Sequence, residues 1–132
     1  MRALVVEHNE SLRKLFRLFL KKNGFVTEDT SNGLIALQLL LRNNYDIIIT
    51  DMDMPEVDGM ELYECISTLL PHLIRRIIFA TGNSVSEKYK KFYNSIPCPV
   101  LYKPFPLVEL KKLIESMLEK NSEIQPQKSN AI

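Results

Sequence analysis

The apolar residues of this chain follow two alternating patterns. Short runs rich in apolar and β-branched residues, typical of buried strands, occur at residues 3–6, 25–28, 45–50, 77–80 and 99–102. Elsewhere, apolar residues recur every three or four positions, which favours amphipathic helices. These helices are predicted at residues 12–20, 34–41, 61–70, 85–93 and 107–118. Asn9 or Ser11 is predicted to cap the first helix, and Asn23-Gly24 to end it.

The alternation of five predicted strands with five predicted helices indicates an α/β fold. Crossovers between parallel strands are right-handed, so we expect a doubly wound, five-stranded parallel sheet with helices on both faces. The run Ile47-Ile48-Ile49 is typical of a strand that is covered on both faces. Residues 1–120 are predicted to form one domain. Residues 121–132 are polar and lack periodicity, and we expect them to be a disordered tail.

The composition of the 132 residues excludes several classes of protein. Hydrophobic residues make up 45% of the chain, charged residues 25%, and the formal net charge is +1. This balance lacks the excess of Lys and Arg that nucleic-acid-binding domains carry. No apolar run is long enough for a transmembrane span or a signal peptide. Cys65 and Cys98 form no CxxC pair, so we expect reduced thiols in a cytoplasmic protein that binds neither nucleic acid nor a membrane.

Polar side chains follow four of the five predicted strands at the point where each strand ends. They are Glu7, His8, Asp51, Asp53, Thr81 and Lys103. Ligand sites of such sheets lie at the carboxyl ends of the strands, so we expect these groups to converge on one rim. Carboxylates in one place repel each other unless a cation intervenes. Mg²⁺ suits an all-oxygen site that leaves positions open for water and phosphate.

This set of groups suits phosphoryl transfer. The Asp51 carboxylate is ionised near neutral pH, so it can attack phosphorus and form an acyl phosphate without a general base. Negative charge then spreads over the phosphoryl oxygens. Mg²⁺, the Lys103 ammonium and the Thr81 hydroxyl are each suited to stabilise part of that charge.

The segment from Asp51 to Gly59, DMDMPEVDG, resembles the D-x-x-M-P-x-x-D-G motif of response-regulator receiver domains in two-component signalling. Lys103-Pro104-Phe105 is similar to the K-P-F motif of the same family, and Thr81 lies between the two motifs. Glu7 stands where the family has the first member of an acidic pair. The resemblance covers residues 2–120 and implies the flavodoxin-like (βα)5 fold.

The resemblance also implies roles for individual residues. Asp51 would be phosphorylated by a histidine kinase or phosphotransfer protein, with no enzymatic activity beyond phosphorylation and dephosphorylation of the chain itself. Glu7, Asp51 and the backbone carbonyl of Asp53 would hold Mg²⁺. Thr81 would bind the phosphoryl group and Lys103 would pair with it. The Lys103-Pro104 bond would be cis, and a downstream effector protein would read the change on the face of the last two helices and the last strand.

Two positions depart from the family pattern. His8 stands where relatives have an aspartate, and imidazole nitrogen is a poor Mg²⁺ ligand. His8 is therefore either a surface or capping residue or a ligand for a transition metal, and Glu10 is a possible substitute carboxylate. Val100 stands where relatives have a Tyr or Phe ring that swings with the threonine. Tyr102 points to the same side of its strand, and either takes over part of that role or only packs against the last helix.

Two other functions fit parts of the sequence. A haloacid-dehalogenase-like phosphatase also has D-x-D after a buried strand, as in Asp51-Met52-Asp53. Such enzymes need a downstream acidic pair, whereas this chain has no aspartate after Asp58. Asp58 itself is predicted to cap a helix. The second alternative is a degenerate receiver that binds partner proteins without phosphoryl transfer, because His8 disturbs the metal site.

Overall fold

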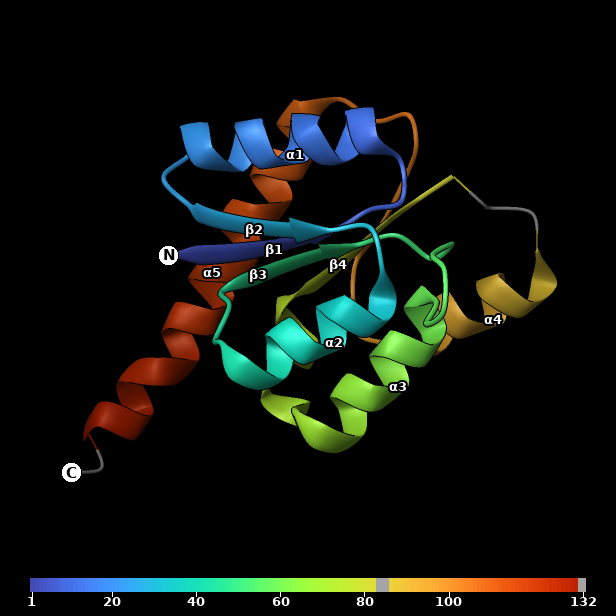
Figure 1. Ribbon diagram of the computed structural model, residues 1–132. Coiled ribbons are helices and arrows are strands. Elements are labelled where there is room, and N and C mark those ends of the chain that lie inside the picture. The colour runs from blue at the N-terminus through green and yellow to red at the C-terminus, as the bar shows by residue number, and fades with distance from the viewer. Residues whose placement is uncertain (83–85, 131–132) are drawn as a thin grey trace.

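The computed structural model describes residues 1–82 and 86–130, with the backbone alone for residues 123–130 (Figure 1). One sheet of five parallel strands runs through the centre in the order β2-β1-β3-β4-β5. This order confirms the predicted doubly wound α/β fold. The strands are β1 (Arg2–Val6), β2 (Val26–Thr30), β3 (Ile47–Thr50), β4 (Ile77–Thr81) and β5 (Val100–Tyr102).

Helices cover both faces of the sheet, as Figure 1 shows. The helices are α1 (Glu10–Lys22), α2 (Gly33–Arg42), α3 (Gly59–Leu69), α4 (Glu87–Ser95) and α5 (Leu107–Asn130), with a short 3₁₀ helix, η1 (Pro71–Arg76), after α3. One core cluster packs α1 and α5 against the sheet, and the other packs α2, α3 and α4 against the opposite face.

Successive residues of the central strands point alternately into these two clusters. In β3, Ile48 belongs to the cluster under α2, α3 and α4, whereas Ile47 and Ile49 face α1 and α5. All three are fully or almost fully buried. This explains why the first three positions of β3 are all apolar, as expected for a parallel sheet that is covered on both faces.

Side chains that follow the strands cap the helices. Asn9, rather than Ser11, caps α1, because its side-chain oxygen accepts a hydrogen bond from the Leu12 N–H. Asp58 caps α3 and forms a capping box with Glu61, which confirms the predicted capping role of Asp58. These caps fix where the loops at the carboxyl rim of the sheet enter the helices.

One helix boundary was predicted wrongly, and one short helix was not predicted. The last helix does not end at Leu118 but continues to Asn130. The structure also forms η1, which the sequence pattern did not indicate.

The length of α5 does not test the predicted domain boundary near residue 120, because a helix can continue past the last residue that packs on the core. Among the described side chains, the last ones in the core cluster are Met117 and Leu118. Disorder of residues 121–132 stays a prediction for solution, and residues 131–132 lie outside the described part. Residue 85, the expected start of the fourth helix, also lies outside it, and α4 begins at Glu87. In the described ranges no helix is both long and apolar enough to cross a membrane.

Candidate functional site

Four residues predicted for the site lie at the carboxyl ends of neighbouring strands. Glu7 follows β1, Asp51 follows β3, Thr81 ends β4 and Lys103 follows β5. Backbone hydrogen bonds continue the sheet through them, since the Asp51 N–H donates to Val6 and the Lys103 N–H to Thr81. Glu7, Asp51 and Thr81 are all buried. The strands therefore place two carboxylates, a hydroxyl and an ammonium on one rim, as expected.

The ammonium of Lys103 joins the two buried carboxylates. Its Nζ lies 2.6 Å from Glu7 Oε1 and 3.2 Å from Asp51 Oδ2. The other oxygen of each carboxylate accepts a backbone hydrogen bond, Glu7 Oε2 from the Asn9 N–H at 3.0 Å and Asp51 Oδ1 from the Met52 N–H at 2.7 Å. Both carboxylates are thus held in position by the loops that carry them.

The site holds two carboxylates, those of Glu7 and Asp51, that are largely shielded from water. Burial raises the pKa of Glu7, and the nearby charge of Asp51 adds to this increase. The hydrogen bonds from Lys103 and from the backbone of Asn9 act in the opposite direction. Ionisation of Glu7 is therefore energetically unfavourable here, and a further cation at the site would make it less so.

An arginine that looked like an ordinary surface residue in the sequence supports Glu7. Arg13 of α1 donates from Nη1 to the carbonyl oxygen of Glu7 at 3.0 Å and from Nε to Asp29 at 3.0 Å. The Glu7 N–H donates to the carbonyl of Thr30 at the end of β2. The edge strand thus contributes to the site through its backbone and through Asp29. Apolar periodicity carries no signal for either contact.

His8 and Asp53 are exposed and lie at a cleft of about 450 Å³. The other lining residues are Met54, Pro55, Asp58 and Tyr89. Tyr89 comes from α4, and burial together with the charges of Asp53 and Asp58 raises the pKa of its hydroxyl. Sequence reasoning missed Tyr89, because nothing in the polar α4 segment indicated that this ring reaches the rim. Glu10 is exposed in the first turn of α1.

Within the described ranges, no group of three His, Cys, Asp or Glu side chains is arranged to hold a metal ion. Glu7 and Asp51, however, already share one cationic group, the Lys103 ammonium. Carboxylate oxygens are hard donors of the kind that Mg²⁺ prefers. The chemistry of the Glu7 and Asp51 oxygens is therefore compatible with Mg²⁺, whereas the His8 imidazole is a poor ligand for it.

The residues predicted to respond to the phosphoryl group lie on β4 and β5. Thr81 is paired with Tyr102 across the two strands, and Phe79 with Val100. Val100 packs into the core cluster under α4, whereas Tyr102 is 44% exposed and makes a ring contact with Tyr93 of α4. The Lys103-Pro104 peptide bond is cis, as the resemblance implied.

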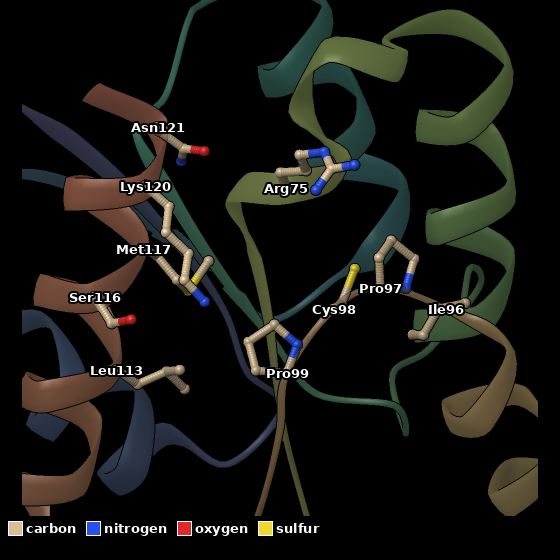
Figure 2. A pocket seen from close by; sticks show the side chains of 10 residues that line it. All are labelled: Arg75, Ile96, Pro97, Cys98, Pro99, Leu113, Ser116, Met117, Lys120 and Asn121. Atoms are coloured by element: carbon tan, nitrogen blue, oxygen red, sulfur yellow. The ribbon is translucent and has the colours of Figure 1, made fainter. Parts of the chain in front are cut away.

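A second pocket, of about 340 Å³, lies at the opposite, amino-terminal end of β4 and β5 (Figure 2). Figure 2 shows Arg75 and Lys120 on either side of it, with Cys98 and two prolines between them. Among the described residues that line it there is no carboxylate. It is therefore separate from the carboxylate pair and from Lys103.

Similarity to known proteins agrees with this geometry. A family model, the response regulator receiver domain, matches residues 3–115. The chain belongs to this family and is a receiver domain of two-component signalling, which sets it apart from the phosphatases with a D-x-D motif.

The relatives include longer proteins. The chain is 33% identical over 119 residues to the probable transcriptional regulator ycf29 of Porphyra purpurea, covering 90% of this chain and 57% of that protein. It is 27% identical to the two-component response regulator ARR10 of Arabidopsis thaliana, covering 98% of this chain and 23% of that protein. The chain thus spans little more than half of the first relative and about a quarter of the second.

A solved structure supports the fold assignment. The chain is similar to the response regulator protein TrrA of Thermotoga maritima, determined in complex with Mg(2+)-BeF, with a TM-score of 0.74 and 27% identity. The match covers 89% of this chain and 98% of that one.

Proposed function

We propose that Asp51 accepts a phosphoryl group from a phosphohistidine of a histidine kinase or phosphotransfer protein, and that the phosphorylated domain acts on a downstream effector protein. The observation that carries this proposal is the pairing of a buried carboxylate with an ammonium at the strand ends. Asp51 Oδ2 lies 3.2 Å from Lys103 Nζ. A carboxylate in this setting is held as a nucleophile and has a cation beside the charge that develops during transfer.

The reaction needs few groups. An oxygen of the Asp51 carboxylate attacks phosphorus while the bond from phosphorus to the donor nitrogen breaks, and its electron pair stays on the imidazole, which then takes up a proton. Lys103 holds the attacking group in place and can turn toward the incoming phosphoryl oxygens. Thr81, buried at the end of the neighbouring strand, supplies a hydroxyl that donates to one of these oxygens.

Glu7, Asp51 and the backbone carbonyl of Asp53 would hold Mg²⁺. When bound, this ion supplies positive charge against the phosphoryl oxygens and removes the repulsion between the two carboxylates. The complex of TrrA with Mg(2+)-BeF supports the choice of metal. His8 is exposed and is not a member of this ligand set. We place the reaction in the cytoplasm, where the free thiols of Cys65 and Cys98 stay reduced.

Acetyl phosphate in the presence of Mg²⁺ tests the proposal. We expect a phosphoryl adduct in the intact mass of the wild-type chain and none in Asp51→Asn, which keeps the size of the side chain. A His8→Asp variant should gain adduct faster, because it adds a carboxylate at the metal site. If the wild type forms no adduct with either Mg²⁺ or Mn²⁺, the domain is a protein-binding module without phosphoryl transfer.

A further inference from the structure

Helix α4 is attached to the sheet by two neighbouring aromatic residues, the partly buried Phe92 and the buried Tyr93, and both rings contact Phe79 of β4. The helix has nine residues and is mostly polar, and Tyr93 is its buried residue, with 7% of its surface exposed. The Tyr93 ring makes edge contacts with Phe79 at 5.6 Å and with Tyr102 at 6.3 Å. A displacement of the Tyr93 ring is therefore expected to displace α4.

The strand register places Tyr93 over Thr81. Phe79 and Thr81 are two residues apart in β4, so their side chains point to the same face of the sheet. On the neighbouring strand, Tyr102 is the partner of Thr81. The two strand residues whose rings Tyr93 contacts, Phe79 and Tyr102, thus flank Thr81, one along the strand and one across it.

The hydroxyl of Tyr93 faces the same place. It is buried and has no hydrogen bond of regular geometry with the residues that the structure describes. Burial raises the pKa of Tyr93 to about 12, and the Thr81 side chain acts on the hydroxyl from close by in the opposite direction. A buried hydroxyl without a good partner is costly, so its environment is sensitive to where the Thr81 oxygen lies.

Position 100, in contrast, offers no ring to follow the threonine. Val100 is the β5 partner of Phe79, two residues from the partner of Thr81, and its side chain is short and packed in the core. Tyr102 is nearly half exposed. The buried ring next to Thr81 therefore belongs to the helix rather than to the strand.

We propose that Tyr93 is the positioning residue that couples Thr81 to α4. When Thr81 turns to donate its hydroxyl to the phosphoryl group, the Thr81 oxygen beside the Tyr93 hydroxyl moves, and α4 shifts with the Tyr93 ring. The signal then leaves the site as a displacement of α4, carried by a side chain of that helix. This coupling rests on the proposed phosphorylation of Asp51.

Tyrosine labelled with ¹³C at Cζ tests the coupling in the unmodified full chain. The five tyrosines give separable signals that Tyr→Phe variants assign. Acetyl phosphate and Mg²⁺ should shift the Tyr93 signal and leave the Tyr45 signal unchanged, because the Tyr45 hydroxyl donates to Glu28 away from the site. Intact mass on the same sample gives the phosphorylated fraction. A full adduct with an unmoved Tyr93 signal overturns the coupling alone, whereas no adduct overturns the proposed function and the coupling with it.

Tyr93→Phe separates coupling from packing, since it keeps the ring and removes the hydroxyl. The variant should melt at the same temperature as the wild type or higher, and should be phosphorylated to the same extent. Its backbone amides at residues 87–95 should lose most of the shift that phosphorylation causes in the wild type. Tyr89→Phe on the same helix is the matched control and should keep that shift. Equal α4 shifts in the wild type and Tyr93→Phe would contradict the coupling.

Discussion

Replacing Lys103 by methionine should destabilise the domain strongly, although the residue lies at the surface rim. The change removes the cation that two buried carboxylates share and keeps most of the side-chain volume. Lys103 Nζ is 2.6 Å from Glu7 and 3.2 Å from Asp51, and only 21% of its side chain is exposed. The variant therefore leaves two negative charges side by side without their common partner.

The distances give the magnitude. At an effective dielectric constant of about 20, unit charges at these separations attract by roughly 6 and 5 kcal/mol before desolvation is subtracted. Removing one partner of a buried ion pair costs about 3–5 kcal/mol in measured cases. Burial already raises the pKa of Glu7, so this carboxyl can take up a proton once the ammonium is gone. We therefore expect a loss near the lower end, about 3 kcal/mol at pH 7.

Urea unfolding at pH 7 with EDTA measures this loss directly. The midpoint should fall while the slope of unfolding free energy against urea stays the same. Lys112→Met, which removes an exposed lysine on α5, is the control and should change stability by no more than about 0.5 kcal/mol. Adding Glu7→Gln to Lys103→Met should restore part of the stability. A loss of less than about 1 kcal/mol for Lys103→Met would refute the reasoning, since exposed pairs contribute no more than that.

Three further outcomes follow from the same contacts. Because burial raises the pKa of Glu7 above its ordinary 4.5, the folded state binds this proton more tightly than the unfolded chain. Its stabilising effect is present below pH 4.5 and is lost as pH rises through the folded pKa, so urea titrations in EDTA should show a fall that Glu7→Gln lacks. Burial raises the pKa of Cys98 from 9.0 to about 12. In the native protein Cys98 should therefore react with iodoacetamide roughly a thousandfold more slowly than an ordinary thiol. Peptide maps should show that the half-buried Cys65 reacts first. In Gly59→Ala the added Cβ would lie 2.6 Å from the carbonyl oxygen of Asp51, so the variant should lose about 1–3 kcal/mol in urea unfolding and form less adduct with acetyl phosphate.

The sequence predicted the parts of the site that depend on topology. Once the alternation of strands and helices is recognised, the carboxyl ends of parallel strands must share one rim. Glu7, Asp51, Thr81 and Lys103 each stand directly at such an end, and the structure brings them there. The roles of these residues in phosphoryl transfer stay predictions.

The parts that sequence reasoning missed depend on packing between distant segments. His8 is exposed, which agrees with the surface alternative given for it, and Asp53 is exposed as well, because the direction of a loop side chain depends on contacts that periodicity does not record. Tyr93 lies in a polar helix whose apolar residues are too few to define a face, and its place over Thr81 follows only from the register of β4 and β5. The continuation of α5 to Asn130 has no counterpart in the apolar periodicity, which ends at Leu118.

The central claim is that Asp51, rather than a neighbouring carboxylate, takes the phosphoryl group. Borohydride reduces an acyl phosphate of aspartate to homoserine, which marks the site covalently. After treatment with acetyl phosphate, Mg²⁺ and borohydride, trypsin should release residues 43–75, the peptide that holds Asp46, Asp51, Asp53 and Asp58. We expect homoserine at position 51 alone in the fragment spectrum of this peptide. Homoserine at position 53, or an unmodified peptide from a chain that carries the adduct, would contradict it.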